Sequence, residues 1–180
     1  MKKVIIFIVI AVVAAAAGVF VFFNSIEKNM TDSSKLKTFS HAEFTVKLPQ
    51  NMKPKKNLYT VSTGEEEIAY YSNTQACCSI SKIPYSANEY LKDMDIEKYC
   101  QNLKINGESI TIYPVGDGFY YYRDVEASNI FKNTTELFNI EAIFKGENAV
   151  YSIVTQCRAA DKAKYKDIMI SWIETFQLKN

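Results

Sequence analysis

The feature that most constrains this chain is an uninterrupted apolar segment at its N-terminus. Residues 4–23 carry no polar or charged side chain, and this run of twenty residues directly follows Lys2 and Lys3. At about 1.5 Å of rise per residue, a helix of this length covers roughly 30 Å, the thickness of the hydrocarbon core of a bilayer. The segment therefore predicts a single transmembrane helix that precedes the rest of the fold.

A cleaved secretory signal peptide is the alternative interpretation of this segment. The two N-terminal lysines form a positively charged start, and residues 14–18 are similar to a small-residue cleavage site. However, apolar residues continue from 19 to 23, beyond the point of such a cleavage, which favours an uncleaved signal anchor. A lipoprotein is excluded, because the first cysteine is Cys77, far beyond the apolar run.

The charges next to the anchor predict its orientation. Positive charge is enriched on the cytoplasmic side of a membrane segment, so we expect residues 1–3 to form a cytoplasmic tail. Residues 24–38 contain no aromatic side chain and are predicted to be a polar tether. Residues 39–180 then form one extracytoplasmic domain of ordinary size. The prediction is a single-pass protein of the cell membrane.

The charge of the outer region excludes one class of partner. Two of the 21 Lys and Arg side chains precede the anchor, which leaves 19 against 20 acidic side chains. A nucleic-acid binder concentrates positive charge on one face, and this region shows no such excess. We therefore expect the membrane and a protein as partners, and no nucleic acid.

Four cysteines lie in the predicted outer domain, where an oxidising compartment allows disulfides. Cys77 and Cys78 are adjacent in a predicted strand, so their side chains should point to opposite faces. We therefore expect two disulfides, in which each of them bonds to one of Cys100 and Cys157, with the connectivity open. Four free, buried thiols are the alternative in a reducing compartment. Zinc is disfavoured, because the spacing lacks paired C-x-x-C units.

The hydrophobic pattern of the outer domain predicts many short strands and a closing helix. Alternating apolar residues predict strands at residues 43–49, 58–62, 67–72, 77–84, 108–114, 118–127, 136–145 and 148–157. Helical spacing appears at 87–94 and 96–103, with Asp95 as the expected cap of the second segment. The strongest helical pattern runs from Tyr165 to Phe176, and its Trp172 is predicted to be in the core.

Glycine residues mark the two tightest expected turns. The sequence PVGDG joins the strands at 108–114 and 118–127, and Gly116 and Gly118 are expected to provide positive φ angles there. Gly146 is expected to do the same in the KGEN turn between the last two strands.

The order of these elements and several short motifs resemble the PsbP-like family. The resemblance rests on core-type positions over about residues 40–178: Phe44, Leu48, Pro49, Gly146, Asn148, Tyr151, Tyr165, Ile168, Ile173 and Phe176. The namesake of the family is an extrinsic subunit of photosystem II, and a nuclear Ran-binding protein has the same fold. The resemblance implies an α+β fold, an α/β/α sandwich around an antiparallel sheet, in a membrane-anchored bacterial relative. It also implies docking onto other proteins and provides no catalytic residue.

The search for catalytic motifs in the sequence leads to the same expectation. His41 is the single histidine and has no cysteine or serine at a spacing typical of a nucleophile and its base. No G-x-S-x-G, H-E-x-x-H, phosphate-loop or EF-hand pattern is present. Cys100 is the one candidate nucleophile. We predict a non-enzymatic protein with no cofactor and no metal.

The sequence GFYYYRD is the densest aromatic stretch and contains the candidate partner-binding residues Tyr120, Tyr122 and Arg123. In a strand, Tyr120 and Tyr122 share one face, while Phe119, Tyr121 and Arg123 share the other. Tyrosine and arginine are enriched where proteins bind. An aromatic patch for a partner is one interpretation, and two buried faces beneath helices are the alternative.

Two functional hypotheses follow from the sequence. The first is an anchored extracytoplasmic domain that docks onto a protein partner without catalysis. The second is a small-ligand or metal-binding domain, or a thiol redox protein that uses Cys77 and Cys78.

Overall fold

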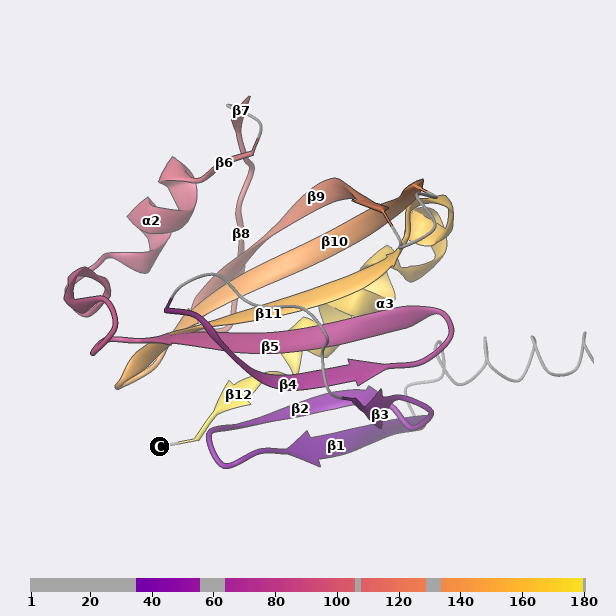
Figure 1. The fold of residues 1–180 in the computed structure, drawn as a ribbon, viewed down its shortest axis with the longest axis horizontal. Coiled ribbons are helices and arrows are strands. Elements are labelled where there is room, and N and C mark those ends of the chain that lie inside the picture. The colour runs from indigo at the N-terminus through magenta and orange to yellow at the C-terminus, as the bar shows by residue number, and fades with distance from the viewer. Residues whose placement is uncertain (1–34, 56–63, 106–107, 129–133, 180) are drawn as a thin grey trace, which may run out of the picture.

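The computed structural model describes residues 35–55, 64–105, 108–128 and 134–179 (Figure 1). The predicted cytoplasmic tail and membrane anchor, and the strand predicted at 58–62, lie outside these residues. Within them, no helix has the length and apolar character needed to cross a bilayer. The last part of the predicted tether, from Leu36 to Thr38, belongs to strand β1 (Leu36–Ser40), so the folded region begins inside that stretch.

An antiparallel sheet of seven strands forms the centre of the described fold, in the order β3-β4-β5-β11-β10-β9-β8. Its strands are β3 (Lys53–Pro54), β4 (Glu66–Ser72), β5 (Ala76–Pro84), β8 (Tyr113–Val115), β9 (Gly118–Ser128), β10 (Thr134–Lys145) and β11 (Ala149–Arg158). The longest four, β5 and β9 to β11, lie where the apolar alternation predicts them. The strand predicted at 108–114 is interrupted, because only its two ends are in strands.

Two smaller sheets accompany the large one. Strand β2 (Phe44–Pro49) lies between β1 and β12 (Gln177–Leu178), and both of these strands are antiparallel to it. Strands β6 (Lys104–Ile105) and β7 (Glu108–Ser109) form a short hairpin. The pairing of β12 with β2 brings the two ends of the described chain together beside the large sheet (Figure 1).

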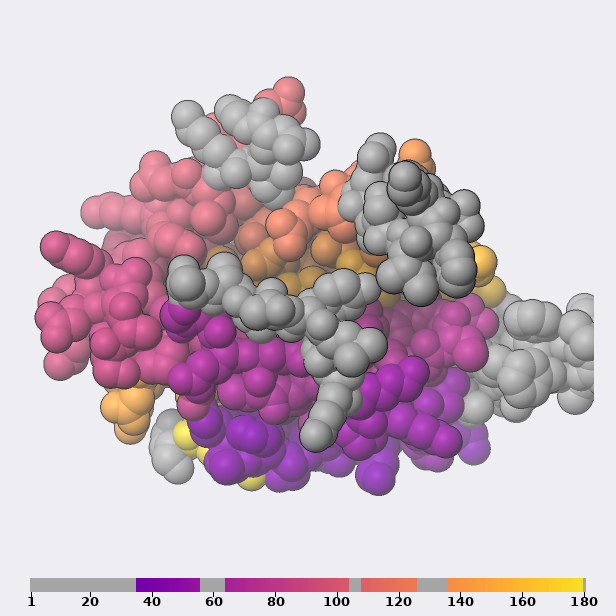
Figure 2. Space-filling view, viewed as in Figure 1, coloured from indigo at the N-terminus to yellow at the C-terminus, as the bar shows by residue number. Residues whose placement is uncertain are grey.

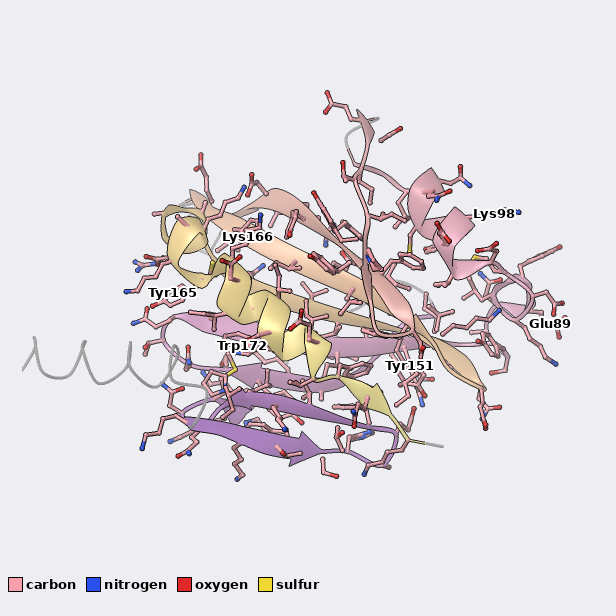
Figure 3. All side chains as sticks on the ribbon, turned by 180° about the vertical axis from the view of Figure 1, so that it is seen from behind. Glu89, Lys98, Tyr151, Tyr165, Lys166 and Trp172 are labelled. Atoms are coloured by element: carbon pink, nitrogen blue, oxygen red, sulfur yellow. The ribbon has the colours of Figure 1, made fainter. Side chains whose placement is uncertain are left out.

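Helices cover both faces of the large sheet, so the fold is α+β as predicted. Helix α3 (Lys162–Glu174) crosses one face and packs on β10, β11 and β2 (Figure 3). Helix α2 (Ile96–Asn102) lies on the opposite face over β9 and β10. In the space-filling view of that face, the segment that includes α2 stands at one end in pink (Figure 2).

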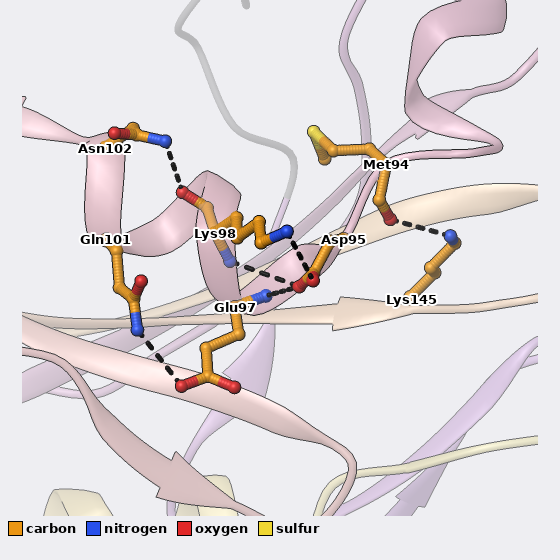
Figure 4. Close-up of polar contacts among 7 residues, drawn as sticks. All are labelled: Met94, Asp95, Glu97, Lys98, Gln101, Asn102 and Lys145. Carbon is orange, nitrogen blue, oxygen red and sulfur yellow. Dashed lines mark hydrogen bonds and ion pairs between the residues drawn. The ribbon is translucent and has the colours of Figure 1, made fainter.

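The break before α2 has a local cause. The Asp95 carboxylate accepts hydrogen bonds from the backbone N–H groups of Glu97 and Lys98, at 3.0 and 3.2 Å (Figure 4). This is the N-cap predicted at Asp95. The helix predicted at 87–94 shortens to a 3-10 turn at Glu89–Leu91.

Two separate hydrophobic clusters fill the two faces. The larger one lies between the large sheet, α3 and the small sheet, and it includes Trp172, which is fully buried as predicted. The smaller one lies beneath α2 and includes Cys100, Tyr121, Ile143 and Val150.

The glycines of the two turns differ from the prediction. Only Gly116 has a positive φ, of +52°, and it provides the reversal between β8 and β9. Position 118 requires glycine because no side chain fits there: a Cβ would overlap the carbonyl oxygen of Ile143. Similarly, a Cβ at Gly146 would lie 2.7 Å from the Tyr151 ring. Close packing, rather than backbone angle, selects glycine at these two positions.

Candidate functional site

Three tyrosines, Tyr113, Tyr120 and Tyr122, form a tyrosine cluster at one edge of the large sheet. The hairpin register places Tyr113 of β8 opposite Tyr120 of β9, and strand alternation places Tyr122 on the same face. The ring of Tyr113 lies 5.2 Å from that of Tyr120 and 5.3 Å from that of Tyr122, measured between centroids. The three rings therefore contact one another as a unit.

The tyrosine cluster lies beside α3 and is partly open to solvent. The ammonium of Lys166 on α3 is 4.3 Å from the centre of the Tyr122 ring, within the range of a cation–π contact. Tyr113 keeps 37% of its surface exposed, while Tyr120 and Tyr122 are half-buried against the core. Burial, with the neighbouring Tyr122 hydroxyl, raises the pKa of Tyr120 to about 12. The Tyr120 phenol therefore stays protonated and able to donate a hydrogen bond.

The predicted candidate Arg123 lies on the other face of β9, as the alternation predicts. Its guanidinium forms an ion pair of 3.3 Å with Glu141 of β10. The structure thus brings Tyr120 and Tyr122 together but does not add Arg123 to their patch. Sequence reasoning missed Tyr113 and Lys166 as neighbours. The two-residue turn at Gly116 and Asp117 could have predicted Tyr113 as a neighbour, because the turn sets the register between β8 and β9. The position of Lys166 could not be predicted in this way, because it depends on how α3 packs on the sheet.

The four cysteines are all free, so the structure contains none of the predicted disulfides. Cys78 is buried beneath α3, and its neighbour Cys77 points to the opposite face, as expected. Cys157 lies in the same core as Cys78, but it is paired with Ala76 in the register, whereas Cys78 is paired with Thr155. The two thiols are therefore diagonal neighbours rather than directly opposite.

Cys100 and Cys77 have different surroundings. Cys100 lies in the cluster beneath α2, together with Tyr121, Ile143 and Val150, and Cys77 is not part of that cluster. The Cys77 thiol instead donates a hydrogen bond to the side-chain carbonyl oxygen of Gln156, at 3.6 Å.

The surroundings of the thiols disfavour nucleophilic or redox chemistry. Burial raises the pKa of all four, to about 11 for both Cys100 and Cys157. The thiolate is the reactive form, and a redox or catalytic cysteine needs a lowered pKa. Cys100, the one candidate nucleophile in the sequence, therefore lies in an unsuitable environment.

A groove of about 1460 Å³ lies at the opposite end of α3, between β12 and the β10–β11 turn. On its wall, Lys82 forms an ion pair of 2.7 Å with Glu43, and the Tyr151 hydroxyl donates to the same carboxylate at 2.7 Å. The Tyr85 hydroxyl donates to the carbonyl of Gly146 at 2.7 Å. The polar groups of this wall are thus bonded to one another.

Neither His41 nor the acidic residues form a metal centre in the described part of the chain. The Nδ1 atom of His41 accepts a hydrogen bond from the backbone N–H of Glu43 at 3.3 Å, and its ring stacks on Phe44. Among the described residues, no group of three or more His, Cys, Asp or Glu side chains is placed to hold a metal ion.

Comparison with solved structures identifies the fold. A protein from Bacteroides thetaiotaomicron superposes with a TM-score of 0.54 at 14% identity, over 81% of this chain and 49% of its own, so this chain spans about half its length. Cyanobacterial PsbP from Synechocystis superposes with a TM-score of 0.50 at 7% identity, over 83% of this chain and 95% of its own. The Ran-binding protein Mog1p of Saccharomyces cerevisiae has a TM-score of 0.45 at 10% identity, over 79% of this chain and 95% of its own.

The described domain therefore has a PsbP-like fold, as the sequence resemblance implied. No protein-family model and no curated protein sequence matches the chain. The similarity is one of fold, and function has to be argued from the surfaces of this chain.

Proposed function

We propose that this chain is a membrane-anchored protein whose outer domain docks onto a protein partner and does not catalyse a reaction. The observation that carries the proposal is the tyrosine cluster, a half-exposed group of aromatic rings on a rigid sheet beside the ammonium of Lys166. Tyrosine is enriched at binding hot spots, because its ring provides contact area and its hydroxyl provides a hydrogen bond.

The anchoring part of the proposal rests on residues 4–23. Their length and apolar character suit a transmembrane helix, and the lysines before them favour a cytoplasmic N-terminus. Alkaline phosphatase fused to the C-terminus should be active, because this reporter folds only in an oxidising compartment. A fused reporter that is active only in the reducing interior would reject the outward location of the domain.

The docking part is tested by crosslinking in native membranes, followed by mass spectrometry of the purified chain. A specific crosslinked protein should be lost when Tyr120 and Tyr122 are both changed to serine. Tyr90→Ser is the matched control, because Tyr90 is 91% exposed and lies in the 3-10 turn on the opposite side of the sheet. Unchanged crosslinking of the double variant would remove the tyrosine cluster from the proposal.

The alternative functions have weaker support. A thiol redox role for Cys77 and Cys78 conflicts with their opposite orientation and with burial, which raises the pKa of each thiol. A small ligand would fit the volume of the groove, but it would have to compete with the internal bonds among Glu43, Lys82 and Tyr151. Binding at the tyrosine cluster does not have to break such bonds, because the ring of Tyr113 is already exposed.

A further inference from the structure

We propose that β9 accepts an extended acidic segment of the partner as an additional strand, directly beside the tyrosine cluster. This inference rests on the proposed docking function. It adds the backbone geometry and the charge of the segment that docks.

The outer edge of β9 is only partly paired. On its inner side the strand pairs with β10 along its whole length. On its outer side, β8 pairs only with Gly118, Phe119 and Tyr120. Among the described residues, no strand pairs with the outer edge of residues 122–128. An unpaired edge presents a row of N–H and C=O groups, which is a template for another strand.

The register indicates which residues would bond to an added strand. Val115 and Gly118 flank the two-residue turn between β8 and β9, and the pair that flanks such a turn is the hydrogen-bonded one. Hydrogen bonding in an antiparallel ladder alternates along the strand. Even-numbered residues of β9, including Tyr122 and Asp124, therefore direct their backbone groups outward. Their side chains lie on the face that carries the tyrosine cluster.

Charged side chains on an edge strand usually prevent it from pairing with another chain. The two charged side chains next to Tyr122 on β9 form ion pairs with neighbouring elements. Arg123 forms its ion pair with Glu141 on β10, at 3.3 Å. Asp124 forms an ion pair with Lys162 on α3, at 3.1 Å. Both charges are thus paired with neighbouring elements, and the Asp124 side chain keeps 62% of its surface exposed.

The charge of the expected segment follows from Lys166. Its ammonium contacts the Tyr122 ring at 4.3 Å, and no carboxylate among the described residues lies within ion-pair distance of it. In a paired strand, the residue opposite Tyr122 would have its Cβ atom about 5 Å away on the same face. The Tyr122 hydroxyl donates to the Tyr120 hydroxyl at 3.4 Å, so the proton of Tyr120 is the one directed to other acceptors. An acidic side chain there would meet both Lys166 and the Tyr120 hydroxyl as a donor.

The first test measures peptide binding to the full chain in nanodiscs of neutral lipid. The probe is a capped peptide of about ten residues with alternating Thr and Val and one central Glu residue, so that no second carboxylate lies opposite Asp124. We expect it to bind, and the same peptide with Lys in place of Glu to bind more than about tenfold more weakly. Lys166→Gln should weaken binding of the Glu peptide about fivefold, the size of one exposed ion pair.

Lys98→Gln is the matched control for charge. Lys98 is 78% exposed on α2, on the opposite face, so its removal should leave the affinity unchanged. Equal binding of the Glu and Lys peptides, or an equal effect of the two lysine variants, would overturn the acidic character of the segment. Absence of binding by every peptide would overturn the proposal as a whole.

The second test distinguishes strand addition from side-chain docking. N-methyl groups are placed on alternate residues of the Glu peptide, so that each of two isomers has one blocked edge. One isomer should keep the parent affinity, and the other should lose more than about tenfold, because several backbone hydrogen bonds disappear. If both isomers bind like the parent, strand addition is wrong, whereas docking on the tyrosine cluster still stands.

The third test asks whether a second copy of this chain, instead of a partner, pairs with the outer edge of β9. Sedimentation of the full chain should show a species whose size does not change with concentration or with added Glu peptide. A dimer that the peptide dissociates would show that β9 pairs with β9 of another copy, and would overturn the assignment to a partner. The effect of Tyr120→Ser with Tyr122→Ser on crosslinking tests the proposed function separately.

Discussion

The hydroxyl of Tyr151 donates a hydrogen bond of 2.7 Å to the carboxylate of Glu43, and this contact ties the large sheet to the start of β2. Lys82 of β5 forms an ion pair of 2.7 Å with the same carboxylate. The hydrogen bonds from Lys82 and Tyr151 lower the pKa of Glu43. Glu43 is thus the polar link between the two sheets.

The first prediction is that Glu43 makes stability depend on pH in the acidic range. Its pKa in the folded protein is below the ordinary value of about 4.3, so the folded state binds its proton less readily than the unfolded state. The stabilisation is therefore complete above about pH 4.3 and is lost as the pH falls through the folded pKa. Glu43→Gln should lower the free energy of unfolding by about 1 kcal/mol at pH 7.

Urea unfolding of both proteins between pH 7 and pH 3 checks this prediction. The difference in unfolding free energy should be constant down to about pH 4.5 and should then shrink. A difference that stays constant to pH 3 would mean that the charge of Glu43 does not stabilise the fold.

The second prediction separates the two glycines of the β8–β9 turn. Gly118→Ala should cost about 3 kcal/mol, because the new Cβ would overlap the Ile143 carbonyl and the Phe144 ring. Gly116→Ala should cost about 1 kcal/mol, because its φ of +52° is unfavourable for alanine although the space around it is open. Thermal unfolding of both variants checks the order. Equal losses would indicate that the backbone relaxes around position 118.

Strongly periodic segments were the predictable part of this fold. The alternation in β9 correctly separated Tyr120 and Tyr122 from Arg123, and the helical spacing around Trp172 correctly predicted α3. In both cases the pattern of one segment reports directly on which side is buried. The cap at Asp95 was predictable for a similar reason, because it depends on the next three residues only.

Features set by long-range register were not predictable. Alternation correctly placed Cys77 and Cys78 on opposite faces, but the distance to Cys100 depends on where α2 packs along β9 and β10. The contact between Lys166 and Tyr122 likewise depends on how α3 crosses the sheet. Strand β12 has only two residues, too few to show any alternation, and it forms because β2 offers an edge.

The third prediction concerns the residue that ends α3. The Thr175 hydroxyl accepts a hydrogen bond of 2.9 Å from the Lys47 backbone N–H and donates one of 2.7 Å to the Trp172 carbonyl. It therefore joins the helix end to β2. Thr175→Val should lower the free energy of unfolding by about 1 kcal/mol. Thr175→Ser is the matched control that keeps the hydroxyl and should cost less. If both variants are equally destabilised, the methyl group rather than the hydroxyl is the important part.

The last prediction is that the purified chain contains four thiols. In guanidinium without reductant, all four should react with a thiol reagent, since all four cysteines are free. In the native protein at pH 8 the reaction should be slow, because a pKa of about 11 for Cys100 and Cys157 leaves about one thiolate per thousand molecules at each site.

Thr74→Cys is the control for this measurement, because Thr74 is exposed in the turn before β5, and the new thiol should react quickly in the native state. If the denatured protein shows no thiols, the chain forms the disulfides expected for an oxidising compartment, and Cys100 must then approach β5 by a movement of α2. Fast reaction of the native wild-type protein would instead indicate that burial does not suppress the thiolates, and would restore the redox alternative.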